Sequence, residues 1–376
     1  MARAGRAVAR VASAAALTIH ESPRHGLAGR VSLGPSRVSP GRTTVPTSTL
    51  EGLLMRFVYV MDPMDGLLPD KDTTFAFQRA AQERGHAALH CLMRDMFFQE
   101  GDLFARVRPV TVSAEPPHYS LGEPLDVRLA EADAVFIRKD PPFDRAYLYA
   151  TLLLEQIRGR TLVLNDPRGI RDANEKLYSL HFARFAPKTI VTADGARILA
   201  FLDTLGRAVI KPLDGAGGAG VLLLDRGDWN KKAIVDLTTS EGRRYALVQE
   251  YLPAVREGDK RILLLDGVLL GAINRVPRPD DLRSNIHVGG VVHPALVTTE
   301  ERAIIDAIAP RLRKDGLHFV GLDMIGGKLT EVNVTSPTGI QELSRHVRRD
   351  VAGDVIAWVE RRVEDLAPAP SSVQVL

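Results

Sequence analysis

Three oxygen-bearing side chains flank one glycine turn near the end of the chain. Asp323 precedes the pair Gly326-Gly327, and Glu331 and Asn333 follow it, with apolar arms on both sides that predict a β-hairpin. Alternate residues of a strand lie on one face, so Glu331 and Asn333 project the same way about 7 Å apart. Carboxylate and amide oxygens at that spacing suit a hard cation such as Mg²⁺. The alternative is a pair of solvated acids beside a turn.

The length of the turn decides whether Asp323 joins the other two side chains. A two-residue Gly326-Gly327 loop turns Asp323 to the face opposite Glu331. A three-residue loop, extended by Lys328, brings it to the same face. We predict the three-residue loop and, with it, a metal site that includes Asp323.

A glycine-rich segment, residues 215–220, follows the apolar strand that ends at Lys211. Its letters match G-x-G-x-x-G, but that motif marks a dinucleotide site only before a helix, and here the run 221–224 predicts a second strand. Strand, glycine loop and strand form a flap whose backbone N–H groups can cover phosphates. Lys211 points inward and needs an anionic partner, which a triphosphate would supply. The alternative is a flexible hairpin with a lysine at a strand end.

Two arginines fall on neighbouring strands further along. The predicted strand 261–265 turns at Asp266-Gly267 into the strand 268–274, which brings Arg261 and Arg275 together. Convergent guanidinium groups bind a carboxylate or a transferring phosphoryl group through bidentate contacts. Residues 276–292, with two prolines and two glycines, are a candidate lid.

The folded part begins at Arg56 with a strand (56–61) and a helix, capped by Thr73 or Thr74, that ends at Gly85. The turn between them lacks the glycines of a dinucleotide fingerprint, so we predict a Rossmann-like domain without a bound dinucleotide.

A polar segment follows the next buried strand of this domain. The strand 134–137 runs into residues 138–144, where two prolines stop any helix. Open α/β sheets bind ligands at such strand ends, which favours a binding role for Arg138 and Asp140 over a solvated surface loop.

A second domain is predicted from about residue 174. Asn174-Glu175-Lys176 opens a helix, and Lys176 can reach an anion held at that helix end, although a plain surface lysine is the alternative. Further strands and helices are predicted at 188–191, 194–205, 245–251, 299–314 and 344–360. The predicted domains are therefore 55–173 and 174–362, with a loose tail at 363–376.

Length and composition restrict the class of protein. The chain has 376 residues, 45% of them hydrophobic, which is enough for more than one core. Its single cysteine, Cys91, excludes an internal disulfide and a cysteine-rich zinc site. Residues 1–54 contain seven arginines, no lysine and two glutamates, whereas the remainder has 42 basic and 44 acidic residues. The near-neutral remainder lacks the basic footprint of a nucleic-acid-binding protein.

Residues 1–54 predict a disordered extension, because they are rich in Arg, Ala, Ser, Gly and Pro. They resemble a transit peptide in composition, but Met55 directly precedes the first clear strand, so an over-extended start is the alternative. No apolar run is long enough to span a bilayer without interruption. We predict a cytoplasmic protein without a membrane segment.

Several motifs in one order resemble those of the bacterial type of glutathione synthetase, within the ATP-grasp superfamily. Features shared with other ATP-grasp ligases are Lys176, Lys211, the glycine flap, the hinge 249–252, Asp323 and the segment 331–333. More specific are MDP (61–63), RKDPPFD (138–144), NEK (174–176), KPLDGAGG (211–218), GDKR (258–261) and EVNVTSPT (331–338). The resemblance covers about 56–360 and implies an N-terminal Rossmann-like (pre-ATP-grasp) domain followed by a two-lobed ATP-grasp domain, of mixed α/β and α+β class.

The resemblance implies a ligase that joins γ-glutamylcysteine and glycine with ATP, through an acylphosphate, to give glutathione, ADP and phosphate. It implies ATP-binding residues Lys176, Lys211, Gly215, Gly217, Gly218, Gln249, Glu250, Tyr251, Leu252 and Asp259. Mg²⁺ or Mn²⁺ would be held by Asp323, Glu331 and Asn333. Arg261, Arg275 and Asn333 would stabilise the reacting groups, and Arg138, Asp140, Ser336, Pro337 and Thr338 would contact the substrates. A homo-oligomer, with a tetramer as the expected form, is also implied.

One segment departs from the family pattern. The family's lid resembles PQGGETRGN, whereas residues 277–285 read PRPDDLRSN without those glycines, although Asn285 and Gly289-Gly290 persist. Two alternatives to this ligase remain: an ATP-grasp enzyme that joins a different acid and amine, and a nucleotide-binding module without activity. The second would lack a metal ligand or a phosphate-binding lysine, and this sequence has both.

Overall fold

The computed structural model describes residues 55–215, 217–278 and 290–366. All of them belong to one structural unit. The predicted N-terminal extension and most of the predicted lid lie outside the described residues. None of the described helices combines the length and the apolar character that crossing a membrane requires.

The first sheet is a mixed eight-stranded sheet whose central strands are parallel. Its order is β3-β4-β2-β1-β7-β8, and β5 and β6 pair with β4. The strands are β1 (Arg56–Met61), β2 (Ala87–Leu92), β3 (Met96–Gln99), β4 (Asp102–Val112), β5 (Tyr119–Leu121), β6 (Leu125–Arg128), β7 (Ala134–Ile137) and β8 (Leu162–Leu164). Strand β1 is apolar on both faces because helices cover both sides of it.

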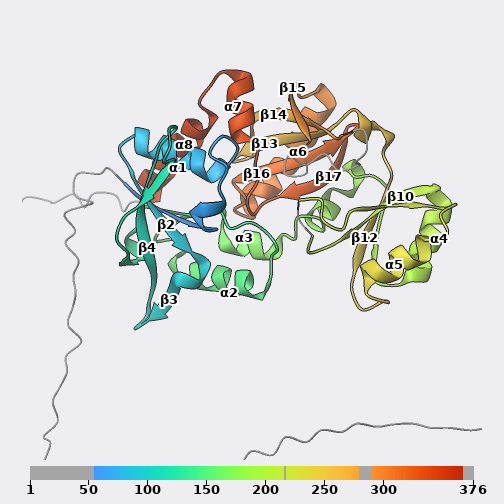
Figure 1. Cartoon of the computed structure of the whole chain (residues 1–376), viewed down its shortest axis with the longest axis horizontal. Coiled ribbons are helices and arrows are strands. Elements are labelled where there is room, and N and C mark those ends of the chain that lie inside the picture. Colours follow the sequence, from blue (N-terminus) through green and yellow to red (C-terminus); the bar gives the residue numbers. More distant parts are fainter. Residues whose placement is uncertain (1–54, 216, 279–289, 367–376) are drawn as a thin grey trace, which may run out of the picture. The chain divides into compact units, whose positions relative to one another are not determined.

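Helices α1 (Thr73–Glu83) and α8 (Val351–Leu366) cover one face of this sheet, and α2 (Arg145–Leu154) with α3 (Pro167–Asp172) covers the other (Figure 1). The last helix of the chain thus packs on the first sheet, where Val355 and Trp358 join the core of Phe57 and Phe136.

Two predicted helix boundaries were wrong. Asp72, not Thr73 or Thr74, caps α1, and its side chain accepts a hydrogen bond of 2.7 Å from the Phe75 N–H. The helix predicted over 344–360 is two helices, α7 (Ile340–Val347) and α8, because the chain turns through the left-handed region at Arg348 (φ 53°). Helix α8 also runs into the predicted tail, as far as Leu366.

Two antiparallel sheets follow in the chain. The four-stranded sheet has the order β11-β10-β12-β9, with β9 (Thr189–Thr192), β10 (Arg207–Pro212), β11 (Leu222–Asp225) and β12 (Ala246–Glu250). Helices α4 (Gly195–Leu205) and α5 (Lys231–Thr239) pack on one face of it through Ile198, Leu202 and Val235. The opposite face of β10 carries Val209 and Lys211 toward a cavity.

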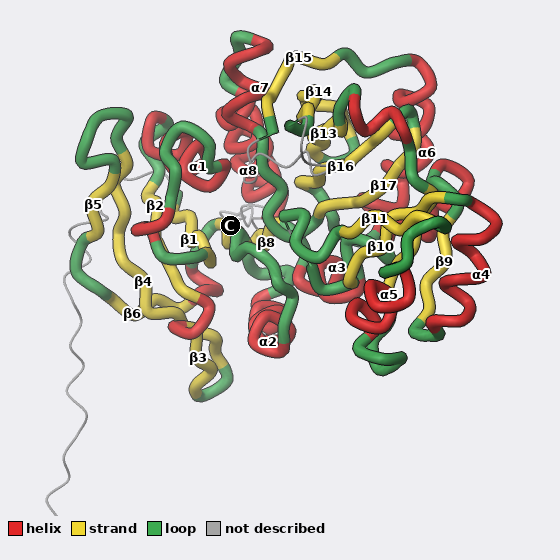
Figure 2. Tube along the Cα trace, turned by 45° about the vertical axis from the view of Figure 1, so that its right-hand side comes forward, coloured by secondary structure: helices red, strands yellow, loops and turns green. Residues whose placement is uncertain are grey.

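The five-stranded sheet has the order β15-β14-β13-β16-β17. Its strands are β13 (Asp259–Leu265), β14 (Val268–Val276), β15 (Val291–Ala295), β16 (Phe319–Ile325) and β17 (Lys328–Asn333). Helix α6 (Thr299–Lys314) packs on this sheet, and Figure 2 shows the two antiparallel sheets next to each other. The predicted fold class, a Rossmann-like domain followed by a two-lobed ATP-grasp domain, is confirmed.

Lys176 lies in a turn rather than in a helix. The side chain of Asn174 accepts hydrogen bonds from the N–H groups of Lys176 (3.2 Å) and Leu177 (3.1 Å). A 3₁₀ helix, Tyr178–Phe185, begins only after this turn. The helix predicted to open at Asn174 was therefore wrong, because the asparagine side chain organises a local turn instead.

The hairpin that carries Asp323 and Glu331 has a two-residue loop, so the predicted three-residue loop was wrong. Gly326 and Gly327 both have positive φ (54° and 73°), as a tight hairpin turn requires. Instead of a longer loop, a β-bulge adds one unpaired residue, Thr330, to the second strand. Met324 pairs with Leu329 before the bulge, and Asp323 pairs with Glu331 after it. Asp323 therefore lies on the same face as Glu331, as predicted, but the bulge and not a three-residue loop brings it there.

Candidate active site

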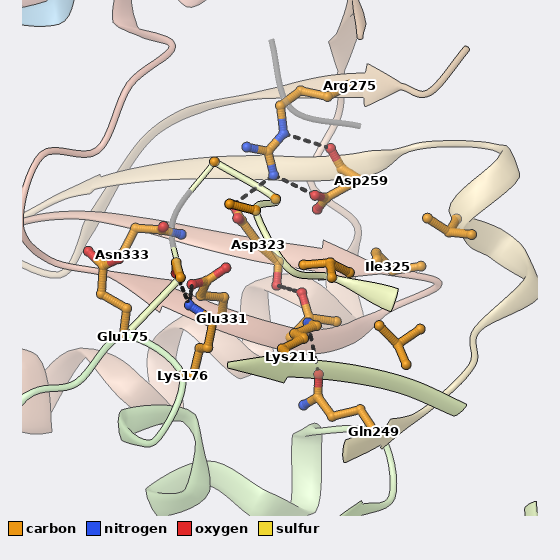
Figure 3. A pocket seen from close by; sticks show the side chains of 18 of the residues that line it. Glu175, Lys176, Lys211, Gln249, Asp259, Arg275, Asp323, Ile325, Glu331 and Asn333 are labelled. Carbon is orange, nitrogen blue, oxygen red and sulfur yellow. Dashed lines mark hydrogen bonds and ion pairs between the residues drawn. The ribbon is translucent and has the colours of Figure 1, made fainter. Parts of the chain in front are cut away.

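A cavity of about 440 Å³ lies between the two antiparallel sheets (Figure 3). It is lined by every residue for which a role was predicted except Arg138. These lining residues are Asp140, Lys176, Lys211, Gly215, Gly217, Gly218, Gln249, Glu250, Tyr251, Leu252, Asp259, Arg261, Arg275, Asp323, Glu331, Asn333, Ser336, Pro337 and Thr338. Motifs far apart in the sequence thus meet at one place.

Arg138 is buried behind the cavity wall, with 5% of its surface exposed. Its Nε donates to Thr74 Oγ1 (3.1 Å) and its Nη2 to the Pro337 carbonyl (3.1 Å). The Ser336 hydroxyl in turn donates to the Arg138 carbonyl (3.3 Å). Burial lowers the pKa of Arg138, and the negative charges of Asp72 and Asp140 oppose this effect. Arg138 thus supports the Ser336-Pro337 segment from behind.

Lys176 joins the glycine loop to the hairpin. Its Nζ donates to the Gly215 carbonyl and lies 3.4 Å from Glu331 Oε1. The preceding residue, Glu175, anchors the turn to the end of β17, because its Oε1 accepts hydrogen bonds from the Val334 N–H (3.0 Å), the Thr335 N–H (3.1 Å) and the Thr335 hydroxyl (2.7 Å). Burial, reinforced by the charge of Glu331, raises the pKa of Glu175.

Lys211 enters the cavity from the opposite sheet. Its Nζ donates to Gln249 Oε1 (3.1 Å) on the neighbouring strand β12. Burial lowers the pKa of Lys211, and Glu331 works against that shift. A phosphate placed between Lys211 and Lys176 would restore the charge balance that the protein alone leaves incomplete.

The glycine loop has the backbone that such a flap needs. Gly217 and Gly218 have positive φ (61° and 82°), which side chains rarely tolerate. Gly215 is required for space: a Cβ there would lie 2.8 Å from the Ala219 carbonyl oxygen and 2.9 Å from Pro212 Cγ. At Gly215, Gly217 and Gly218 the loop therefore presents main chain rather than side chains to the cavity.

Asp323 is held by two arginines. Arg261 Nε and Nη2 donate to its two carboxylate oxygens (2.5 and 3.1 Å), and Arg275 Nη2 lies 3.0 Å from Oδ1. Burial would raise the pKa of Asp323, but Arg261 and Arg275 outweigh burial and hold the pKa well below its usual range. The Asp323 carboxylate is therefore ionised at neutral pH.

Arg275 also contacts a second acid, since its Nη2 lies 2.6 Å from Asp259 Oδ2. Burial would lower the pKa of Arg275, but Asp259 and Asp323 outweigh burial and hold it above its usual range. The two arginines lie on the adjacent antiparallel strands β13 and β14, as predicted.

The oxygen donors at the hairpin fit a hard cation. Asn333 Nδ2 donates to the Gly321 carbonyl (3.2 Å), which leaves Oδ1 as an acceptor beside the Glu331 carboxylate. In the described part of the chain, no three His, Cys, Asp or Glu side chains are grouped so that they could hold a metal ion. Phosphate oxygens or water would therefore have to complete the coordination, as is usual for Mg²⁺.

Sequence reasoning missed the apolar part of the cavity, formed by Pro187, Val209, Leu223, Val255 and Ile325. Val209 shares a strand face with Lys211, and this alternation was the available signal. The other four come from separate elements that only tertiary packing brings together. Val209 pairs with Gln249, and the Val255 N–H donates to the Leu252 carbonyl, so an apolar slot that suits a flat ring lies beside residues 249–252.

Two family models match this chain in succession. The N-terminal domain of prokaryotic glutathione synthetase matches residues 55–171, and the ATP-grasp domain of the same family matches residues 175–348. The chain belongs to the prokaryotic glutathione synthetase family. It is therefore an ATP-grasp ligase and uses ATP.

Glutathione synthetases of several bacteria are similar over nearly their whole length. That of Synechocystis sp. is 43% identical over 319 residues, which cover 82% of this chain and 100% of the relative. That of Agrobacterium fabrum is 42% identical over 303 residues, or 80% of this chain and 95% of the relative. That of Shewanella oneidensis is 40% identical over 313 residues, or 82% and 99%.

Solved structures of other ligases share the fold. D-cycloserine synthetase DcsG aligns with a TM-score of 0.57 at 18% identity, over 83% of this chain and 100% of that one. The ATP-grasp ligase PsnB, complexed with minimal precursor, Mg and ADP, aligns with a TM-score of 0.54 at 18% identity, over 82% and 97%. At this identity the likeness concerns the ATP-grasp architecture and not the substrates.

Proposed function

We propose that this protein joins γ-glutamylcysteine to glycine with ATP, giving glutathione, ADP and phosphate. The observation that carries the proposal is the cavity where Lys176, Lys211 and the glycine loop converge on Glu331, in a chain of the glutathione synthetase family. Such a cavity supplies cations and amides for phosphates, and phosphoryl transfer needs positioning and charge neutralisation more than a protein nucleophile.

The nucleotide would lie along the cavity with its ends in two different environments. The apolar slot beside Gln249–Leu252 suits adenine, and Asp259 suits the ribose hydroxyls. Lys176, Lys211 and the main chain of Gly215–Gly218 would hold the phosphates. This arrangement is supported by the position of these residues around one cavity of nucleotide size.

Asp323, Glu331 and Asn333 would hold Mg²⁺ or Mn²⁺. The similar structure of the ATP-grasp ligase PsnB was determined with Mg and ADP. When bound, the ion neutralises phosphate charge and polarises the phosphoryl oxygens. The tight binding of Asp323 by two arginines leaves Glu331 and Asn333 as the donors that face the cavity most freely.

The chemistry proceeds in two steps. A carboxylate oxygen of the cysteinyl residue attacks the γ-phosphorus of ATP, the bond to the bridging oxygen breaks, and ADP leaves. The glycine amine, having lost a proton, then attacks the acyl carbon, and phosphate leaves. Arg261 and Arg275 would stabilise the negative charge that develops on the acylphosphate and on the tetrahedral oxyanion. Arg138, Ser336, Pro337 and Thr338 would shape the acid-binding end.

A substrate-pair assay tests the proposal. ADP release and product mass are measured with γ-glutamylcysteine plus glycine, and with other pairs of a carboxylic acid and an amine, including peptides plus glutamate. We expect turnover with the first pair and a product with the mass of glutathione. No turnover with that pair, together with turnover of another, would show a different ATP-grasp ligase.

We further propose domains at 55–173 and 174–366, the second extended from the predicted 362 to the end of α8, a homo-oligomer with a tetramer as the expected form, and a cytoplasmic location. The single, buried Cys91 fits a reducing compartment. Light scattering of the purified protein measures the oligomeric state directly, and a monomer would refute that part of the proposal.

A further inference from the structure

The first domain contributes one charged side chain to the cavity. Among the described residues that line it, only Asp140 and Pro141 come from the part of the chain before residue 174. Both follow β7, at the strand end where an open α/β sheet binds ligands. Asp140 thus lines the cavity from the first domain, whereas the nucleotide-binding strands belong to the second.

The neighbouring lysine does not neutralise this carboxylate. Lys139 Nζ lies 2.9 Å from Asp62 Oδ1 and donates to the Asp140 carbonyl (2.8 Å). Asp62 Oδ2 accepts the Asp140 N–H (2.9 Å), and the Tyr147 hydroxyl donates to the Lys139 carbonyl (3.2 Å). These bonds fix the main chain of Lys139 and Asp140 and turn the lysine side chain toward Asp62.

The Asp140 carboxylate itself is exposed and takes part in no hydrogen bond or ion pair with the described residues. Four other acids of the cavity have partners: Asp323 is bound by two arginines, Asp259 pairs with Arg275, Glu331 lies beside Lys176, and Glu175 accepts hydrogen bonds from Thr335. The Glu250 side chain resembles Asp140 in having no such partner among the described residues, but it belongs to β12, on the nucleotide side of the cavity. Arg138 is near enough to feel the charge of Asp140, but its hydrogen bonds go to Thr74 and Pro337 and none goes to the Asp140 carboxylate. The main chain of Asp140 is fixed, and its carboxylate is free to bind a cationic group of the substrate.

We propose that Asp140 binds the α-ammonium group at the γ-glutamyl end of the acid substrate. The inference rests on the proposed function. Of the two amino groups in the reaction, the glycine amine must lose its proton before it attacks, and a carboxylate beside it would hold it protonated. The α-ammonium of γ-glutamylcysteine never reacts and keeps its charge throughout.

The geometry of the reaction agrees with this assignment. The reacting cysteinyl carboxylate has to lie near the phosphates, and therefore near Lys176, Arg261 and Arg275. The γ-glutamyl end then extends away from the nucleotide, toward the first domain, where Asp140 lies. Asp140 would accordingly determine that the enzyme prefers an acid with a free α-amino group.

Steady-state kinetics with two acids test the inference. γ-Glutamylcysteine is compared with glutarylcysteine, which lacks only the α-amino group. The proteins are the native protein, the variants Asp140→Asn and Asp140→Ser, and the control Asp126→Asn, an exposed acid of β6 outside the cavity. A charge-assisted hydrogen bond gives about 10- to 100-fold in kcat/KM, so the native protein should prefer γ-glutamylcysteine by about that factor. Asp140→Asn should lose most of this preference, with unchanged KM for ATP and glycine.

These kinetics distinguish recognition of the amino group from a different role of Asp140. An equal loss of kcat/KM with both acids would show that Asp140 has only a structural role. If Asp140→Asn and Asp140→Ser still prefer γ-glutamylcysteine as the native protein does, Asp140 does not bind the amino group. A selective rise of the glycine KM would assign Asp140 to the acceptor. Each of these outcomes overturns the inference but not the ligase activity. Absence of turnover of γ-glutamylcysteine by the native protein would refute the proposed function itself.

Discussion

Replacing Asp323 by asparagine tests the buried charge cluster. Arg261 has no other carboxylate within ion-pair distance in the described residues, and both Arg261 and Asp323 have 7% of their side chains exposed. Removing one partner of such a buried pair costs about 3–5 kcal/mol, because the other charge stays buried without compensation. The asparagine keeps the shape of the side chain and can still accept one hydrogen bond, so the loss reflects charge rather than packing.

This cost corresponds to a clear change in melting temperature. For a chain of this size, about 1 kcal/mol shifts the melting temperature by about 1.5 °C, so Asp323→Asn should melt about 5–8 °C below the native protein at pH 7. The matched control is Asp225→Asn, whose partner Arg207 is 62% exposed, and it should shift the melting temperature by no more than about 1.5 °C. Differential scanning calorimetry of the metal-free proteins measures both. Equal, small shifts of the melting temperature in the two variants would refute the view that the Asp323 carboxylate compensates the buried charges of Arg261 and Arg275.

Two further predictions concern the metal donors and the pH dependence of stability. Glu331→Gln and Asn333→Asp should each reduce turnover by at least about 100-fold, since each changes the charge of the metal site. The control is Glu241→Gln, because the Glu241 side chain is 74% exposed. Native-like rates in the first two variants would disprove the metal site. Hydrogen bonds from Arg84, and one from His86, hold the pKa of Glu360 below its usual range despite partial burial. The ionised Glu360 therefore adds to the free energy of unfolding above about pH 5, and this stabilisation is lost as the pH falls below about 4. Glu360→Gln should therefore melt about 1–3 °C below the native protein at pH 7, and this difference should shrink as the pH falls below about 4. A difference that stays constant as the pH falls would contradict the assignment.

The polar residues that share the cavity were predictable from the sequence, some from local signals and the others from the resemblance to the family, whereas the apolar lining was not. The glycines of the flap, the alternation that turns Lys211 inward and the spacing of Glu331 and Asn333 all depend on neighbours within a few residues. The strand pair that carries Arg261 and Arg275 was predictable for the same reason.

What the sequence did not predict depends on contacts between distant segments. The bulge at Thr330 replaced an expected longer loop, and no local signal distinguishes the two. Arg138 lies behind the cavity wall because Thr74 and Pro337 accept its hydrogen bonds, and these residues are far apart in the chain. The return of α8 to the first sheet likewise follows from packing that no single segment encodes.

The most direct test of the account is a crystal structure of the protein with a non-hydrolysable ATP analogue and Mn²⁺, with the metal located by its anomalous signal. We predict a manganese peak at the site of Asp323, Glu331 and Asn333, with the phosphates between Lys176, Lys211 and the glycines 215, 217 and 218. A manganese peak or a triphosphate elsewhere in the molecule, with this cavity unoccupied, would contradict it.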